Sequence, residues 1–316
     1  MRSRLTNDEV RVVSLMRRAR VASNMSHKDA GTALRRNVES DEITVLPGAF
    51  DALSARLATE RFDAVFTSGF GLSASTLGLP DLGFLDRTAN IDRVRDVVKA
   101  CDAPVVADMD TGYGSALNVR KTVSDAIDAG AGGVIIEDQQ WPKRCGHMDE
   151  KRVVDEDEAT TRIRAAADAR DESDADLVIV GRTDAREPRG MDAAVERGRA
   201  LEKAGADVIF VEAPESRGEL ERAATAFEAP TFANMIEGGK TPYMAYEELE
   251  EIGFDVVVYP LSSLLAYTRA VRDTYDALAS EGETTSVEKV SFDEYDEIIG
   301  AERYREMERR YAETNK

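Results

Sequence analysis

Cysteine is scarce in this chain of 316 residues, which has only Cys101 and Cys145. Two cysteines are too few for the disulfide framework of a small secreted protein. The sequence also lacks any run approaching the roughly 18 apolar residues of a membrane span, and it has no apolar core of a secretory signal. These absences predict a cytoplasmic protein that does not act at a membrane.

Positive charge is also in short supply, because 41 Lys and Arg residues face 61 Asp and Glu residues, giving a net charge of −20. Such a surface repels nucleic acid and anionic lipid, so neither is an expected partner. An anionic substrate would need a locally positive pocket. The acidic excess is also typical of proteins from a high-salt cytoplasm, and we predict a halophilic protein that is more stable in molar salt than in low salt.

Residues 1–37 reverse this balance, with nine Lys and Arg against three acidic residues. A peripheral helix over 10–16 or an upstream extension with Met25 as an alternative start would explain the segment. A binding arm is a further alternative. We treat 1–37 as a basic N-terminal extension.

Eight short apolar runs recur along the chain, separated by longer amphipathic stretches. The runs are 43–46, 64–67, 104–107, 133–136, 177–180, 208–211, 230–233 and 256–259. Near-continuous apolar strands are typical of a parallel sheet that helices cover on both faces. Eight such units predict closure into a (β/α)8 TIM barrel.

The stretches between the runs have helical periodicity, and several end in a glycine, as at Gly130, Gly205 and Gly253. A glycine there is the usual left-handed helix stop. No Ser/Gly-rich or proline-rich linker divides the chain. We therefore predict a catalytic barrel over 38–280, followed at 281–316 by C-terminal helices that pack on the barrel or on a neighbouring subunit.

Polar residues follow the apolar runs at their carboxyl ends, where the active sites of such barrels lie. Asp108 and Asp110 follow the third run and Glu137 follows the fourth. Carboxylate oxygens suit Mg²⁺ or Mn²⁺, although an acidic residue at a strand end can also simply cap the next helix. We predict that these three residues bind Mg²⁺, with Mn²⁺ as the alternative.

Arg182, Glu212 and Asn234 follow the next three runs. An arginine can bind a substrate carboxylate through two parallel hydrogen bonds. The structural alternative is a salt bridge from Arg182 to Glu212 or Asp184, and the two roles are compatible.

The loop after the fourth run reads Trp141-Pro142-Lys143-Arg144-Cys145-Gly146-His147. Cations next to a thiol lower its pKa, so we expect Cys145 to be a usable proton donor or acceptor. Gly146 would allow close backbone approach. The alternative is an inert, partly buried cysteine beside a surface histidine.

Two loops rich in small residues follow the second and seventh runs, Ser68-Gly69-Phe70-Gly71 and Gly238-Gly239-Lys240-Thr241-Pro242. Their backbone amides could form a nest for carboxylate oxygens. Glycines in tight turns are common, so only their position makes these loops candidates.

Over roughly residues 43–313 the sequence resembles the isocitrate lyase and phosphoenolpyruvate mutase superfamily. The matching blocks are Gly78-Leu79-Pro80-Asp81, Asp108-Met109-Asp110-Thr111-Gly112-Tyr113-Gly114, Glu137-Asp138-Gln139, Lys143-Arg144-Cys145-Gly146-His147, Arg182-Thr183-Asp184-Ala185 and the nine residues from Asn234 to Pro242. The resemblance implies that Asp108, Asp110 and Glu137 hold Mg²⁺ and that 143–147 is a gating loop. The catalytic residues expected are Lys143, Cys145, His147, Arg182 and Glu212, and the substrate-binding residues are Ser68, Gly69, Phe70, Asp81, Gly146, Arg182, Asn234 and Pro260.

Within this superfamily the lyase branch uses its loop cysteine to protonate the fragment released by cleavage, whereas the phosphorus–carbon branch has Asn and Ser where Cys145 and Gly146 stand. Isocitrate lyases carry an insert and a motif that this chain lacks. The chain is most similar to methylisocitrate lyases and to the members that cleave 2,3-dimethylmalate or hydrolyse oxaloacetate. Pro260 stands where oxaloacetate hydrolases have Ser, and Phe66 where methylisocitrate lyases have Tyr.

We therefore predict an Mg²⁺-dependent carbon–carbon lyase that releases pyruvate from a 2-methylisocitrate-like or 2,3-dimethylmalate-like acid, and that forms a homotetramer as superfamily members do. The alternatives are an oxaloacetate hydrolase or decarboxylase, an isocitrate lyase, a carboxyphosphonoenolpyruvate phosphonomutase-type enzyme, and a barrel with no catalytic activity.

Overall fold

The computed structural model describes residues 29–148 and 150–314. It divides into two compact units, one ending at Ser263 and the other beginning at Leu264. The segment 10–16 and Met25 lie outside the described residues.

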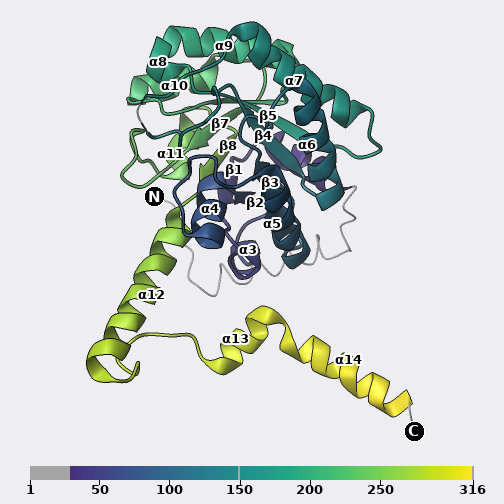
Figure 1. Ribbon diagram of the computed structural model, residues 1–316, viewed down its shortest axis with the longest axis vertical. Coiled ribbons are helices and arrows are strands. Elements are labelled where there is room, and N and C mark those ends of the chain that lie inside the picture. Colours follow the sequence, from purple (N-terminus) through teal and green to yellow (C-terminus); the bar gives the residue numbers. More distant parts are fainter. Residues whose placement is uncertain (1–28, 149, 315–316) are drawn as a thin grey trace. The chain divides into compact units, whose positions relative to one another are not determined.

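Eight parallel strands form the centre of the first unit (Figure 1). They are β1 (Thr44–Pro47), β2 (Val65–Thr67), β3 (Val105–Asp108), β4 (Gly133–Glu137), β5 (Val178–Thr183), β6 (Val208–Val211), β7 (Thr231–Asn234) and β8 (Val256–Tyr259). Their order is β1-β8-β7-β6-β5-β4-β3-β2, and a parallel bridge between Gly48 and Phe66 brings β1 to β2. The predicted (β/α)8 barrel is confirmed.

Helices surround the strands and connect one to the next (Figure 1). In the first unit they are α2 (Ala30–Val38), α3 (Ala52–Thr59), α4 (Gly69–Leu77), α5 (Arg87–Ala100), α6 (Ala116–Ala129), α7 (Glu156–Asp171), α8 (Arg186–Arg189), α9 (Met191–Lys203), α10 (Arg217–Thr225) and α11 (Tyr246–Glu251). Side chains cap several of them, as Asp86 does for α5 and Asp155 for α7. Gly130, Gly205 and Gly253 all have positive φ, as their predicted role as helix stops requires.

The strands bury both faces. One face meets the helices through a cluster that includes Val134, Ile136 and Ile179. The other face fills the barrel with Leu46, Phe210 and other alternate strand residues. Because successive side chains of a strand point to opposite sides, each strand supplies both layers.

Helix α2 covers one end of the barrel interior. Its Leu34 is 1% exposed and belongs to the interior cluster. Gly31 lies so close to the Asp176 carbonyl that it has no room for a side chain. Residues 30–37, which the sequence boundary assigns to the basic extension, therefore pack with the barrel.

The second unit consists of most of α12 (Ser262–Glu281), with α13 (Phe292–Ile299) and α14 (Ala301–Thr314). The apolar residues at helical spacing lie on α13 and α14, and Phe292 and Tyr311 are 87% and 70% exposed. Their packing against another surface stays a prediction, as do the domain boundaries. None of the described helices is long and apolar enough to span a membrane.

The barrel interior predicts a clear difference between two leucines. Leu46→Ala should lower the free energy of unfolding by about 2–5 kcal/mol, because it leaves a cavity among side chains that cannot collapse fully. Leu117→Ala removes the same atoms from a side chain that is 77% exposed and should change stability by less than about 0.5 kcal/mol. Urea unfolding followed by circular dichroism measures both, and equal losses would contradict this account of the core.

Candidate active site

The residues at the strand ends, all but one of them polar, continue the inward-facing rows of the barrel. Each lies two positions beyond an interior apolar residue, so the strand period turns it toward the barrel axis. The pairs are Phe66 and Ser68, Val106 and Asp108, Ile135 and Glu137, Val180 and Arg182, Phe210 and Glu212, Phe232 and Asn234, and Val258 and Pro260. The top of the core is thus the floor of a polar site.

Acidic side chains gather at the ends of β2 and β3. Asp108 Oδ2 accepts a hydrogen bond of 3.0 Å from the Gly69 amide at the start of α4, and Ser68 caps the same helix. A Cβ on Gly69 would lie 3.3 Å from both Asp108 Oδ2 and Asp110 Oδ1. The two carboxylates therefore meet directly beneath Gly69.

Lys143 reaches into this cluster from the loop after β4. Its ammonium group forms an ion pair with Asp81 and lies 2.7 Å from Asp110 Oδ1. Burial raises the pKa of Asp110 to about 6, and Asp108 and Asp81 contribute while Lys143 opposes the shift. Three carboxylates thus share one ammonium group, which leaves the cluster short of positive charge.

Arg182 occupies the opposite part of the barrel mouth. Its Nε and Nη2 donate to the two oxygens of Asp184 at 2.9 and 3.1 Å, and its guanidinium lies over the Phe210 ring at 5.2 Å. Nε is also 3.5 Å from both Glu137 and Glu212. The salt bridge to Asp184 that the sequence offered as an alternative is present, and it orients the guanidinium.

Two buried arginines hold the base of the loop after β4. Arg162 donates to the carbonyl oxygens of Glu137 and Gln139. Arg197 donates to the Asp138 carboxylate and to the Val154 carbonyl. Both ends of the loop are therefore fixed to α7 and α9.

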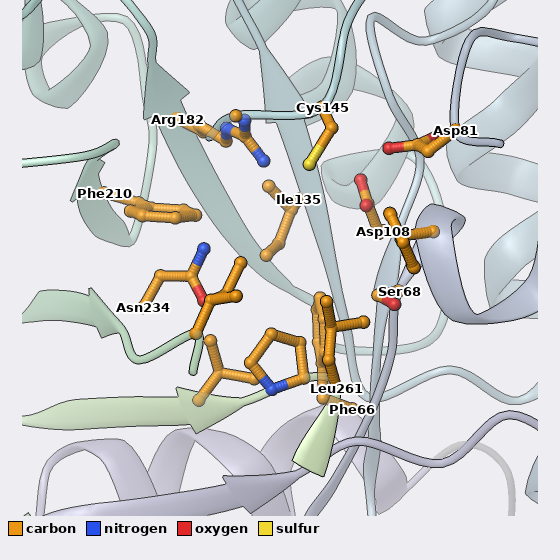
Figure 2. A pocket seen from close by; sticks show the side chains of 15 residues that line it. Phe66, Ser68, Asp81, Asp108, Ile135, Cys145, Arg182, Phe210, Asn234 and Leu261 are labelled. Carbon is orange, nitrogen blue, oxygen red and sulfur yellow. The ribbon is translucent and has the colours of Figure 1, made fainter. Parts of the chain in front are cut away.

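The loop crosses the barrel mouth closely. A Cβ on Gly146 would be 2.5 Å from Arg182 Nη2 and 2.6 Å from Glu212 Oε1, so only glycine fits here without displacement. Cys145 points its sulfur into the pocket, between Arg182 on one side and Asp81 and Asp108 on the other (Figure 2).

The electrostatics of Cys145 differ from the sequence expectation. Burial raises the pKa of the Cys145 thiol to about 11, and Asp81 and Glu212 contribute to the increase while Arg182 opposes it. The neighbouring cations pair with other residues and not with the thiol: Lys143 pairs with Asp81 and Asp110, and Arg144 pairs with Glu150. The predicted lowering of this pKa is wrong.

His147 joins this loop to the loop after β7. Its Nδ1 accepts a hydrogen bond of 2.9 Å from the Lys240 amide, which leaves the hydrogen on Nε2, 3.1 Å from Glu212 Oε1. Asn234 Nδ2 lies 3.3 Å from both oxygens of Glu212. Burial opposes ionisation, but Arg182 and His147 lower the pKa of Glu212, so it is an anion that holds three neighbours.

Residues 34–279 match the family model described as phosphoenolpyruvate phosphomutase. The chain belongs to this family. A solved relative of the same fold is itself described as a phosphoenolpyruvate mutase/isocitrate lyase superfamily member, so the predicted superfamily is confirmed.

Relatives in the family extend over nearly all of the barrel. The 2,3-dimethylmalate lyase of Eubacterium barkeri is 41% identical over 282 residues, covering 88% of this chain and 97% of that protein. The 2-methylisocitrate lyase of Bacillus subtilis (strain 168) is 38% identical over 263 residues, covering 83% and 86%.

Solved structures agree in fold. Oxaloacetate acetylhydrolase in complex with the inhibitor 3,3-difluorooxalacetate superposes with a TM-score of 0.87 at 33% identity, covering 92% of this chain and 99% of the other. Phosphonopyruvate hydrolase complexed with oxalate and Mg²⁺ gives a TM-score of 0.80 at 29% identity, covering 90% and 99%.

The family's expected metal can be tested against the side chains present. Within residues 29–148 and 150–314, no three Asp, Glu, His or Cys groups converge tightly enough to enclose an ion by themselves. Mg²⁺ is usually bound by one or two carboxylates, with water and substrate completing its coordination. Glu137 Oε1 is buried and accepts no hydrogen bond from the described residues, and Asp108 and Asp110 share too little positive charge. These residues fit a divalent cation that completes its coordination with other oxygens.

The structure places the predicted substrate-binding, catalytic and metal-binding residues in two groups. Nine of them line the pocket: Ser68, Phe70, Asp81, Asp108, Cys145, Gly146, Arg182, Asn234 and Pro260. The remaining six are adjacent to it or behind it: Gly69, Asp110, Glu137, Lys143, His147 and Glu212. His147 lines a second cavity, of about 280 Å³, between the loops after β4 and β7.

Sequence reasoning missed several apolar lining residues. Ile135, Phe210 and Val258 form part of the pocket floor, and Ile236 and Leu261 form part of its wall. The first two could have been found by stepping two positions back from the polar strand ends Glu137 and Glu212, and the third by the same step from Pro260. The loop 238–242, suggested by the sequence as a nest for carboxylate oxygens, contacts His147. Gly239 packs against the His147 ring, and the Lys240 amide donates a hydrogen bond to that ring.

A thiol pKa of about 11 predicts slow alkylation of Cys145 at neutral pH. In a Cys101→Ala background, where Cys145 is the single thiol, the rate with iodoacetamide should rise tenfold per pH unit through neutral and mildly alkaline pH, because only the thiolate reacts. Stopped incubations analysed by mass spectrometry give the rate. A plateau below the ordinary cysteine pKa of about 8.5 would contradict the prediction.

Proposed function

We propose that this chain is a Mg²⁺-dependent carbon–carbon lyase, with Mn²⁺ as an alternative ion, that cleaves a 2-methylisocitrate-like or 2,3-dimethylmalate-like hydroxy acid. The products are pyruvate and a carboxylate or dicarboxylate. Relatives named 2,3-dimethylmalate lyase and 2-methylisocitrate lyase support the lyase class.

The observation that carries the proposal is the position of the buried Cys145 sulfur, which faces the pocket from the loop after β4 (Figure 2). The raised pKa of the thiol keeps the proton on sulfur at neutral pH. When the carbon–carbon bond breaks, the substrate hydroxyl gives its proton to a carboxylate of the site, the carbonyl of pyruvate forms and the bonding electrons stay on the other fragment. Cys145 then donates its proton to that carbanion as a general acid.

The groups that would bind the keto-acid half of the substrate come from both sides of the Cys145 thiol. Arg182 supplies a guanidinium that Asp184 has already oriented, and Asn234 adds an amide beside it. Ser68 and Gly69 at the start of α4 add the positive end of a helix dipole. These groups favour an α-hydroxy carboxylate bound before cleavage and an α-keto carboxylate bound after it.

Asp108, Asp110 and Glu137 would hold the ion directly or through water, next to Asp81. The metal supplies a Lewis acid that stabilises negative charge on the oxygens of the reacting acid. Lys143 pairs with Asp81 and Asp110 and remains an ammonium ion, since its own pKa, which burial alone would lower, is raised well above its usual value by the neighbouring carboxylates.

The competing activities are less well supported by the pocket. Phosphonate chemistry is associated with a Ser at the position of Gly146, where any Cβ meets Arg182 and Glu212.

Oxaloacetate hydrolysis is associated with a Ser at the position of Pro260. Pro260 lines the pocket, while Ser262 donates to Glu237 and Ser263 to the Gly48 carbonyl. The oxaloacetate acetylhydrolase structure keeps hydrolysis as the second candidate.

We also propose a cytoplasmic homotetramer adapted to high salt. The exposed apolar side chains of α13 and α14 support association with another surface. The net charge of −20 supports solubility in concentrated salt.

Cys145→Ser should lower kcat by roughly 10²- to 10⁴-fold, because a hydroxyl is a much poorer acid than the thiol it replaces. Binding of oxalate with Mg²⁺, measured by calorimetry, should remain, since Arg182 and the carboxylates are untouched. Cys101→Ser is the matched control and should keep its activity. Unchanged turnover in Cys145→Ser would refute the acid role.

Product analysis separates the candidate reactions. With 2-methylisocitrate and 2,3-dimethylmalate we expect pyruvate plus a carboxylate, and with oxaloacetate little oxalate plus acetate or pyruvate plus CO₂. EDTA should abolish turnover and Mg²⁺ should restore it. Efficient oxaloacetate hydrolysis without lyase activity would overturn the proposal, and so would full activity in EDTA.

A further inference from the structure

Lys151 is a buried lysine that does not line the pocket. It is 3% exposed, and its Nζ donates to the Gly146 carbonyl at 2.6 Å and to Asp184 Oδ1 at 3.0 Å. An ammonium group is costly to bury unless it is paired, and here both partners belong to the site. No motif in the sequence singles out this residue.

The two partners of Lys151 connect separate parts of the site. Gly146 belongs to the loop that carries Cys145, whereas Asp184 follows β5 and holds Arg182 through two hydrogen bonds. Lys151 therefore links the loop backbone to the carboxylate that orients the guanidinium. Gly146 in turn packs against that guanidinium, which closes the ring of contacts.

The backbone of Lys151 is fixed from another side. Glu187 accepts hydrogen bonds from the amides of Glu150 and Lys151, each at 3.1 Å. This side chain lies in α8, outside the pocket. The backbone of Lys151 is therefore held by α8, while its ammonium group binds the preceding loop 143–147.

We propose that Lys151 is a positioning residue that latches loop 143–147 in its closed position, by binding the Gly146 carbonyl and coupling it through Asp184 to Arg182. Closure covers the Cys145 thiol and places it opposite the substrate-binding arginine. The effect on turnover rests on the proposed function, but the effect on loop closure does not.

The latch can be measured by thiol exposure in the full-length Cys101→Ala protein. Lys151→Met removes the charge and keeps the aliphatic stem, and Lys121→Met, on an exposed face of α6, is the matched control. Iodoacetamide should alkylate Cys145 about 10- to 100-fold faster in Lys151→Met, since a hydrogen bond from a charged group resists local opening to that extent. Loss of a cation would by itself slow alkylation, so acceleration reports exposure.

The rates are measured without ligand and again with oxalate and Mg²⁺. The emission of Trp141, the only tryptophan, gives a second report from the same loop. We expect Lys151→Met to shift this emission and, with a substrate, to lower kcat more than it raises KM, while Lys121→Met changes neither. A purely structural role would lower Tm without changing the alkylation rate of the folded protein.

Equal alkylation rates for Lys151→Met and its control in both conditions would overturn the latch. Faster alkylation in a protein that shows no lyase activity would support the latch and refute the proposed function. If Lys151→Met does not fold, Glu187→Ala decides, because it frees the Lys151 backbone without leaving a buried charge unpaired. Faster alkylation in that variant supports the proposal, and an unchanged rate overturns it.

Discussion

The Arg182 guanidinium is the charge on which the rest of the site depends. Glu137, Asp184 and Glu212 all lie within 3.5 Å of its Nε, and each of them also lies beside another functional group. Glu137 lies beside the acidic cluster, Asp184 contacts Lys151, and Glu212 contacts His147 and Asn234. Removing one partner of a buried ion pair typically costs about 3–5 kcal/mol, because the other charge stays buried. The site is therefore a single electrostatic unit, in which the loop, the acids and the amide adjust together.

Much of this arrangement follows from the period of a β-strand. Eight apolar runs and their polar ends predicted the barrel and the edge at which Asp108, Arg182 and Asn234 meet, because parallel strands place their carboxyl ends together. The same period also accounts for Ile135 and Phe210 in the pocket floor, because each lies two positions before a polar strand end. These features depend on local alternation, which a single sequence displays.

The properties that could not be predicted depend on neighbours distant in sequence. Lys143 and Arg144 directly precede Cys145 in the chain, yet they pair with Asp81 and Glu150. The thiol is left among carboxylates, and its pKa is raised. Lys151 resembles any loop lysine until the fold brings it beneath Gly146. Loop conformation decides both cases, and no periodicity fixes the path of the loop after β4.

The balance of buried charge also bears on how an acidic protein takes up an anionic substrate. The sequence suggested that the site must supply its own cations, and Lys143, Lys151 and Arg182 are indeed buried there. Each of them already faces one or more carboxylates, so together they leave no surplus of positive charge. A di- or tricarboxylate would meet repulsion from Asp81, Asp108 and Asp110 unless a further cation were present. The divalent ion that we propose would thus act in binding as well as in chemistry, and substrate affinity should depend on it even where no bond is broken.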